Sequence, residues 1–340
     1  MLNSGGSLTN SGQTQIGNGG VATPSTLNVT GTFTNTGGNL FVYGGNAAGS
    51  NALLNVSGAA PGTLTGNYEL LSSVGSAAVE WGSGAITQIG DGVSNSGYIL
   101  EEGSTAYLEV GATDSNSALK GLATIAGADI VTNAAAITLS SSAAKIENQS
   151  GTNALTGFTT NTANGKFTLS RNAGLTTTGA FSNAGAVTVS TGSTFTLGGA
   201  FTQTGGISTV DGTLAGTGSL NLNAGNLYGT GTLDYGVVDS ATVTPGNSAS
   251  SEGALQVSGT YTQKSTGNLD VTFGGAAAGT QYDQLNVSAT ASLTGTLKIS
   301  LATGYTPPLG ATYDILNASS LAETSRPSTA WLSTRTNTSP

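Results

Sequence analysis

The 340-residue chain contains no cysteine and no histidine, and only 7% of its residues are charged, against about 25% in a typical protein. Without cysteine there is no disulfide, thiolate zinc site or thiol nucleophile. Without histidine the chain lacks the commonest general base and the commonest metal ligand. Eight Lys and Arg against seventeen Asp and Glu give a net charge of −9, which disfavours nucleic acid and anionic membranes. We therefore expect no cofactor and no nucleic-acid partner.

Glycine is abundant, with 53 residues, about twice the usual share. Such a composition suits a flexible linker, but disordered chains combine low hydrophobicity with high charge. Here 37% of the residues are hydrophobic, and they are regularly spaced. The glycines do not recur every third residue, which excludes collagen. The chain is therefore predicted to fold.

No targeting segment is recognisable at the start of the sequence. The opening segment, Met1 to Gly6, lacks the basic and apolar regions of a signal peptide. No window reaches the roughly 18 uninterrupted apolar residues of a membrane span. Repeat-like sequence begins immediately, at Gly6-Ser7-Leu8-Thr9-Asn10. A cytosolic protein and a secreted protein whose start lies upstream both fit these features. The repeat-like start favours the second, and we interpret the chain as a piece of a larger exported protein.

A short alternating pattern runs along the whole chain, with apolar residues at i and i+2 bounded by Gly or Asn. Alternation of this length predicts short strands with one face inward, and the frequent Gly, Thr, Ser and Asn disfavour helices. Examples are Leu27-Asn28-Val29, Leu54-Asn55-Val56, Val187-Thr188-Val189, Phe195-Thr196-Leu197, Leu255-Gln256-Val257 and Leu285-Asn286-Val287.

A second signature joins an aromatic residue or leucine to a Thr/Ser–Asn/Gln step and a glycine. The spacing of its copies at Phe181 and Phe201 suggests one coil of a solenoid, about 20 residues long. The copies are Leu8-Thr9-Asn10, Phe33-Thr34-Asn35, Phe181-Ser182-Asn183, Phe201-Thr202-Gln203 and Tyr261-Thr262-Gln263.

These repeats predict an all-β fold: a single right-handed parallel β-helix (β-solenoid) of about 20 residues per coil over about residues 1–317. Stacked coils pair every interior strand at a spacing of about 4.8 Å and align inward apolar residues in ladders. We expect Val187, Val189, Phe195, Leu197, Leu255, Val257, Leu285 and Val287 to point inward. An array of β-sandwiches is disfavoured, because it requires longer strands and domain-sized units.

The sequence from Gly199 onward resembles the passenger-associated repeat region of bacterial autotransporters and related secreted β-helical proteins. The matching features include Thr244-Pro245-Gly246-Asn247-Ser248, Gly259-Thr260-Tyr261, Tyr282-Asp283-Gln284-Leu285, Leu293-Thr294-Gly295-Thr296-Leu297, Gly304-Tyr305 and Tyr313-Asp314-Ile315-Leu316. The resemblance implies an exported rod of which this region is the stable C-terminal end.

We therefore expect β-solenoid repeats over 1–198, a passenger-repeat-like part of the same solenoid over 199–317, and a non-repeat tail over 318–340. No glycine occurs from Ala311 to Pro340, and the alternation stops near Ala322. A frameshift near Leu321, leaving a disordered, non-native tail, is our hypothesis for this change.

The carboxylates are candidates for catalysis or cation binding, because β-helices include polysaccharide lyases. The candidates are Asp91, Glu101, Glu102, Glu109, Asp114, Asp211, Asp234 and Asp239. Asp91 with Asp114, and Asp211 with Asp234, share one spacing that is close to the expected coil length, so either pair could stack one coil apart and bind a cation. Glu101 and Glu102 are neighbours, so a strand would place them on opposite faces. We interpret the acids as isolated solvated turn residues, and predict no catalytic, cofactor or metal site.

Three other groups of residues invite a functional interpretation. Asp283 lies in the repeat motif, and we expect its carboxylate to cap backbone N–H groups. The pairs Thr194/Thr196 and Thr202/Thr204 resemble ice-binding threonines but are not regularly repeated, so exposed β-structure is the better explanation. The C-terminal tyrosines could stack on sugars or plug the end of the solenoid, and we favour the plug. They are Tyr228, Tyr235, Tyr261, Tyr282, Tyr305 and Tyr313.

These features favour a non-enzymatic cell-surface or secreted protein, structural or adhesin-like. Its expected partners are surface glycans, matrix or neighbouring cells, and edge-to-edge self-association is a further possibility because the first coil lacks a polar cap. An extracellular enzyme acting on polysaccharides, or a glycan- or ice-binding module, is the alternative.

Overall fold

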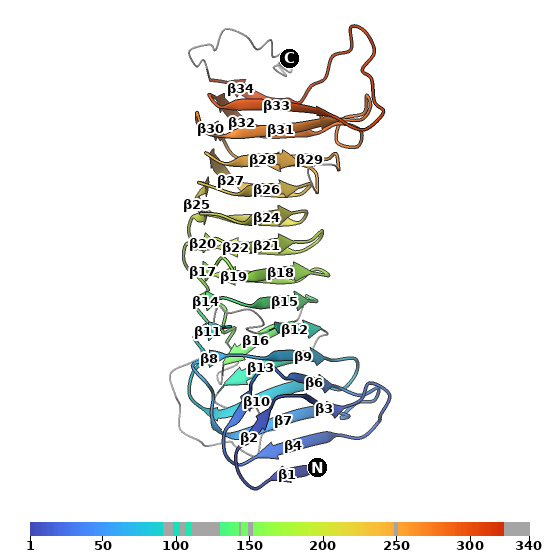
Figure 1. Cartoon of the computed structure of the whole chain (residues 1–340), viewed down its shortest axis with the longest axis vertical. Coiled ribbons are helices and arrows are strands. Elements are labelled where there is room, and N and C mark those ends of the chain that lie inside the picture. The colour runs from blue at the N-terminus through green and yellow to red at the C-terminus, as the bar shows by residue number, and fades with distance from the viewer. Residues whose placement is uncertain are drawn as a thin grey trace. The chain divides into compact units, whose positions relative to one another are not determined.

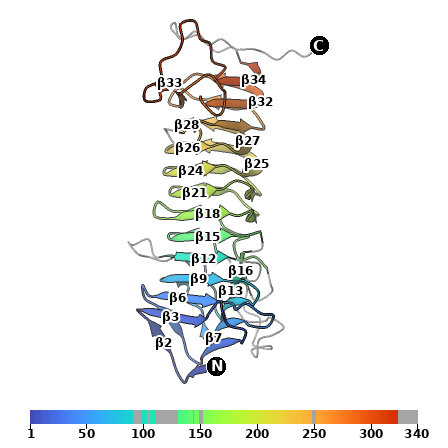
Figure 2. The same cartoon turned by 90° about the vertical axis from the view of Figure 1, so that its right-hand side faces the viewer.

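The computed structural model describes residues 1–90, 98–102, 106–110, 130–142, 144–148, 152–247 and 251–322. The chain forms two compact units, Met1–Gly179 and Ala180–Pro340. The described residues form strands, turns and bends, with no helix among them, and the all-β prediction is confirmed. Strands of each unit stack one above the other, as Figures 1 and 2 show.

The first unit winds through three parallel sheets. One has the strand order β1 (Leu2–Ser4), β4 (Ser25–Val29), β7 (Ala52–Ala59), β10 (Ala77–Ser83), β13 (Ala106–Val110), β16 (Lys145–Asn148). The second has the order β3 (Gln13–Gly17), β6 (Asn39–Tyr43), β9 (Asn67–Leu71), β12 (Tyr98–Glu102), β15 (Ala136–Ser140), β18 (Lys166–Ser170). The third side comprises β2 (Leu8–Asn10) with β5 (Phe33–Asn35), then β8 (Thr63–Leu64), β11 (Gln88–Ile89), β14 (Thr132–Asn133), β17 (Thr160–Asn161), and the strand β19 (Gly174–Thr177) follows.

The second unit continues the same construction. One sheet has the order β21 (Ala186–Val189), β24 (Ile207–Val210), β26 (Asn226–Gly229), β28 (Thr242–Pro245), β31 (Asn268–Phe273), β33 (Thr296–Leu301). The other strands are β20 (Phe181–Asn183), β22 (Thr194–Leu197), β23 (Phe201–Gln203), β25 (Thr213–Leu222), β27 (Thr232–Asp239), β29 (Ala254–Val257), β30 (Tyr261–Gln263), β32 (Gln284–Leu293) and β34 (Leu316–Leu321).

Parallel pairing from coil to coil aligns the apolar residues in ladders inside each unit. In the first unit, Leu27 lies opposite Leu54, and Leu54 lies opposite Val79. In the second, Leu255 lies opposite Leu285. All eight residues predicted to point inward are buried. This stacking buries a continuous apolar core although each strand is short, and it confirms the predicted β-solenoid.

Coil length varies more than the sequence signature indicates. The predicted coil length holds in the first coils of the second unit, where Phe181 lies opposite Phe201 as the signature requires. The last coils of this unit are longer, because Leu255 lies opposite Leu285. In the first unit the step is longer, because Leu27 lies opposite Leu54. The extra residues lie in turns, such as the one between Tyr43 of β6 and Ala52 of β7.

Glycine is required where the chain turns a corner close to the preceding coil. Gly206 has a φ of +64°, and a Cβ at this position would collide with the carbonyl oxygen of Gly185. Both the left-handed backbone and the close approach favour glycine.

The solenoid extends beyond its predicted end at about residue 317. Strand β34 pairs in parallel with β32, and Ala291 lies opposite Leu321. The strand continues because Asn317, Ala318 and Ser320 still find register partners on β32. The remainder of the predicted tail, residues 323–340, lies outside the described residues.

Candidate functional site

The acids singled out in the sequence are not brought together by the described structure. Asp211 accepts hydrogen bonds from the backbone N–H and the hydroxyl of Thr230, at 3.0 and 3.1 Å. Asp234 is exposed and lies opposite Ala215. Asp211 and Asp234 therefore do not stack as a cation-binding pair, because the local coil is shorter than their spacing and brings Ala215 opposite Asp234 instead. Asp91 and Asp114 lie outside the described residues.

Backbone register places three glutamates opposite one another in the first unit. Glu80 of β10 pairs with Glu109 of β13, which pairs with Glu147 of β16. The spacing in the sequence does not indicate this column, because the distances along the chain from Glu80 to Glu109 and from Glu109 to Glu147 are unequal and both exceed the expected coil length. Glu101 and Glu102, by contrast, lie opposite Leu70 and Leu71 of β9. Within the described part of the chain, no three acidic side chains gather in a group that could hold a metal ion.

Asp283 has the backbone-capping role that the sequence predicts. The residue is 1% exposed, and its carboxylate accepts from the backbone N–H groups of Gly253 and Thr272, each at 2.8 Å. Burial raises the pKa of Asp283 to about 6, although the two backbone hydrogen bonds oppose the shift. The residue joins three segments of the backbone and is not open to a ligand.

Asparagines that follow a threonine, both in copies of the second signature (Asn10, Asn35) and in the shorter Thr-Asn strands β14 and β17 (Asn133, Asn161), form internal pairs of amides. Asn10 donates to Asn35 Oδ1 at 3.0 Å, and Asn133 donates to Asn161 Oδ1 at 2.8 Å. All four side chains are buried. The acceptor oxygen of Asn133 also binds the backbone N–H of Ala135, two residues on, at 3.1 Å. The asparagine of the Thr-Asn step therefore holds the corner after its strand, a role that the repeat alone did not reveal.

In the second unit an aspartate occupies one position in a row of register partners. Asp239 lies opposite Leu222 on one side and Gln263 on the other, and its side chain is fully buried. It accepts from the Ala241 N–H at 2.9 Å and from the Tyr261 hydroxyl at 2.8 Å. Burial raises the pKa of Asp239 to about 6, and these two hydrogen bonds partly offset the rise. Asp239 is thus an interior acid and not the solvated turn residue that the sequence predicts.

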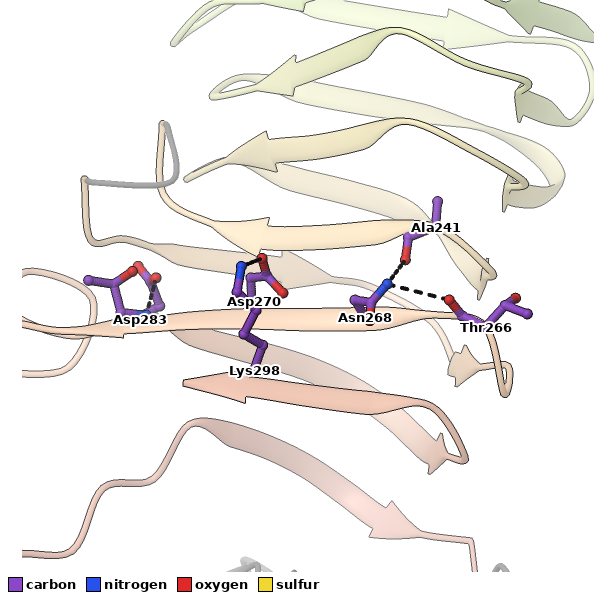
Figure 3. A network of polar contacts seen from close by, with 7 residues as sticks. Ala241, Thr266, Asn268, Asp270, Asp283 and Lys298 are labelled. Carbon is purple, nitrogen blue, oxygen red and sulfur yellow. Dashed lines mark hydrogen bonds and ion pairs between the residues drawn. The ribbon is translucent and has the colours of Figure 1, made fainter. Parts of the chain in front are cut away.

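The outer face of the second unit carries an ion pair in its last coils. Asp270 of β31 lies opposite Lys298 of β33, and the carboxylate and ammonium are 2.9 Å apart (Figure 3). Asn268, on the same strand, donates to the carbonyl oxygens of Ala241 and Thr266, as the dashed lines of Figure 3 show. Because the lysine side chain is 63% exposed, the pair contributes at most about 1 kcal/mol.

The threonine pair on β22 is not repeated on the strand beside it. Thr194 lies opposite Thr213, but Thr196 lies opposite Ala215, which in turn faces Asp234. A flat surface of paired threonines, which ice binding requires, does not form at this position.

Three of the six C-terminal tyrosines, Tyr235, Tyr261 and Tyr282, are buried. The Tyr235 hydroxyl donates to Ala215 O at 3.0 Å. Tyr282 and Tyr313 pack edge to face at a ring separation of 5.3 Å, and Tyr313 lies 4.4 Å from Phe273. These rings pack against the protein itself, and closure of the solenoid's end by the tyrosines stays a prediction.

An aromatic patch that the sequence did not point to lies on the outer face of the first unit. Seven of the eight phenylalanines are buried, and only Phe41 is partly exposed. On the same face of β6, the Tyr43 ring lies 5.8 Å from that of Phe41. The Tyr43 hydroxyl donates to Glu69 of β9 at 2.8 Å. Its pKa rises to about 12 through burial, this hydrogen bond and the charge of Glu69, so the hydroxyl stays protonated.

The patch borders a shallow hollow between β6 and β9. Its lining comprises Asn39, Leu40, Phe41, Asn67 and Glu69. Asn67 donates to Asn39 Oδ1 at 2.6 Å, so the two amides form one rung of an outer ladder. The alternation in Asn39-Leu40-Phe41-Val42-Tyr43 buries Leu40 and Val42 and thereby presents the other three residues outward.

No family model, curated protein or solved structure matches this chain. Among the described residues, no helix is long and apolar enough to cross a membrane.

Proposed function

We propose that the chain is part of an exported, non-enzymatic surface protein, in which a β-solenoid presents its outer faces to glycans, matrix or neighbouring cells. The observation that supports this function most is the construction of each unit, with apolar ladders inside and polar ladders outside. In a stack of this kind each coil contacts only its neighbours, so the stability is spread along the stack, and the outer faces form long, repetitive surfaces.

The outer ladders suit exposure to solvent. Asn28 donates to Asn3 at 2.8 Å, and Asn55 donates to Asn28 at 3.0 Å, so three successive coils are linked by side-chain amides. Asn317 likewise donates to Asn286 at 2.8 Å. Such ladders link neighbouring coils without any disulfide, which agrees with a cysteine-free chain.

The resemblance of residues 199–317 to the repeat region of autotransporter passengers supports the same proposal. Passenger rods are exported to the cell surface, and the motif residue Asp283 has here a structural role in the backbone. The resemblance concerns architecture, and the adhesive role rests on the outer faces described above.

Attachment of cells tests the proposed function. Deletion of the gene should lower attachment of the native cells to their surface or to each other severalfold, and re-expression should restore it. The purified chain, added in excess, should compete with wild-type cells. Unchanged attachment after deletion would contradict the adhesive role.

We also propose that the chain is not an enzyme. Asp211, Asp239 and Asp283 are engaged by Thr230, Tyr261 and backbone N–H groups, which supports structural roles for these acids. The purified chain should leave pectin, alginate, xylan and peptides uncleaved. Turnover that disappears on substitution of one of these acids would overturn this proposal.

A further inference from the structure

We infer that the outer face of β6 and β9 is a carbohydrate-binding site for a neutral saccharide. Phe41 provides the stacking surface, and Glu69, with the Asn39–Asn67 amide pair, provides the polar contacts. This inference rests on the proposed surface function and adds to it a site and a class of ligand.

The position of Phe41 is the first argument. An aromatic ring at a partly exposed position forgoes part of its burial free energy, and the other seven phenylalanines of this chain are in the core. Phe41 lies opposite Gln15 on β3 and Glu69 on β9, so the ring is surrounded by polar side chains on both neighbouring strands. A sugar has apolar C–H faces and a rim of hydroxyls, and it matches an aromatic ring surrounded by polar groups.

The acceptor and donor groups around the ring are the second argument. Tyr43 holds one oxygen of the Glu69 carboxylate at 2.8 Å and so fixes its orientation. The second oxygen has no protein partner within the described residues and can accept from a sugar hydroxyl. A carboxylate that accepts from hydroxyl groups forms stronger hydrogen bonds than a neutral acceptor. The Asn39 and Asn67 amides lie along the same hollow.

Charge determines which saccharides fit. Among the described residues, the lining of the hollow includes one carboxylate and no basic side chain, and the chain as a whole carries a net charge of −9. Acidic sugars would place a second carboxylate beside Glu69 without a counter-ion, which is unfavourable. The site therefore favours neutral sugars and disfavours uronic and sialic acids.

Titration calorimetry and saturation-transfer NMR on the full chain test the inference. The probes are maltotriose, mannotriose and tri-N-acetylglucosamine, with trigalacturonate as the acidic comparison. At least one neutral probe should bind with a Kd on the order of 0.1–1 mM, which corresponds to a binding free energy of about 4–5.5 kcal/mol. Trigalacturonate should bind at least about tenfold more weakly, from the charge repulsion above.

Three variants separate the contributions. Phe41→Thr should weaken binding of the neutral probe about tenfold, because it removes the ring on which the sugar stacks. Glu69→Gln should weaken binding of the neutral probe severalfold, and it should reduce the discrimination against trigalacturonate. Thr138→Ala, two strands along the same outward column, is the matched control and should bind like wild type. Circular dichroism should give the same spectrum for all four proteins.

Several results would overturn the inference: no binding of any neutral probe, undiminished affinity in Phe41→Thr, or equal binding of trigalacturonate and the neutral probe by the wild type. None of these would affect the attachment test of the proposed function. Conversely, unchanged attachment after gene deletion would leave saccharide binding by the purified chain intact.

Discussion

Replacement of the buried Asp239 by asparagine should stabilise the protein at neutral pH. The folded-state pKa of Asp239 is about 6, whereas an exposed aspartate has a pKa of about 3.9. The folded state therefore binds the proton more tightly, and stability falls as pH rises from about 4 to above 6. Above that window the ionised carboxylate costs up to about 3 kcal/mol relative to an exposed one, at about 1.36 kcal/mol per pKa unit.

Asparagine avoids this cost and keeps the local contacts. Its Oδ1 can accept from the Ala241 N–H, which Asp239 now binds at 2.9 Å, and its amide can donate to the Tyr261 oxygen, now 2.8 Å from the carboxylate. The next coil already has an amide in this row, at Gln263, and so does Gln203, which lies two coils away on the other side of Leu222. We expect Asp239→Asn to raise the free energy of unfolding by about 2–3 kcal/mol at pH 8.

Urea unfolding at pH 8.0 and pH 5.0 provides the assay. The stability advantage of Asp239→Asn should shrink by about 1.4 kcal/mol at pH 5.0, because the wild-type residue is then largely protonated when folded and largely ionised when unfolded. Asp283 titrates in the same range but contributes equally to both proteins, so the difference between them isolates Asp239. Asp234→Asn, at an exposed position on the same strand, should change little at either pH. A destabilised Asp239→Asn, or an advantage that does not depend on pH, would refute the reasoning.

Three further substitutions test the packing. Leu255→Ala removes a fully buried side chain opposite Leu285, and it should lower the free energy of unfolding by about 2–5 kcal/mol. Amide exchange should become faster mainly in β29 and β32. A uniform loss of protection throughout the chain would argue against a stack of coils. Asp283→Ala leaves the N–H groups of Gly253 and Thr272 without their acceptor, so it should lower the free energy of unfolding by about 2–5 kcal/mol. A loss below about 0.5 kcal/mol would contradict the capping role. Gly206→Ala should lower the melting temperature clearly more than Gly304→Ala, because both positions have positive φ but only Gly206 is crowded by the Gly185 carbonyl; equal shifts would refute the steric argument.

The fold was predictable from the sequence because its two repeats have direct physical meanings. Alternation in Leu255-Gln256-Val257 and its equivalents specifies which face is buried, and the eight residues expected inward are buried. The spacing of Phe181 and Phe201 specifies a coil where turns are short. It does not specify coils with long turns, such as that between β6 and β7, and so the longer step from Leu27 to Leu54 was missed.

The polar sites were less predictable, because their surroundings depend on register. Asp239 looks like other aspartates in the sequence, and only its place in the row with Gln263 makes it an interior acid. Glu80 and Glu109 are separated by more than the expected coil length, and only the register pairs them. Phe41 lies between the buried residues Leu40 and Val42, so the alternation of the strand places it on the outer face. A large apolar residue at an outward position is the signal in the sequence that could have identified it.

Accessibility of the chain on intact cells tests the central proposal most directly. Native cells that produce the protein should be labelled by an antibody raised against the purified chain, without permeabilisation, and external protease should remove this labelling while a cytoplasmic marker remains intact. Labelling that requires permeabilised cells, in a culture whose medium also lacks the protein, would contradict an exported surface protein.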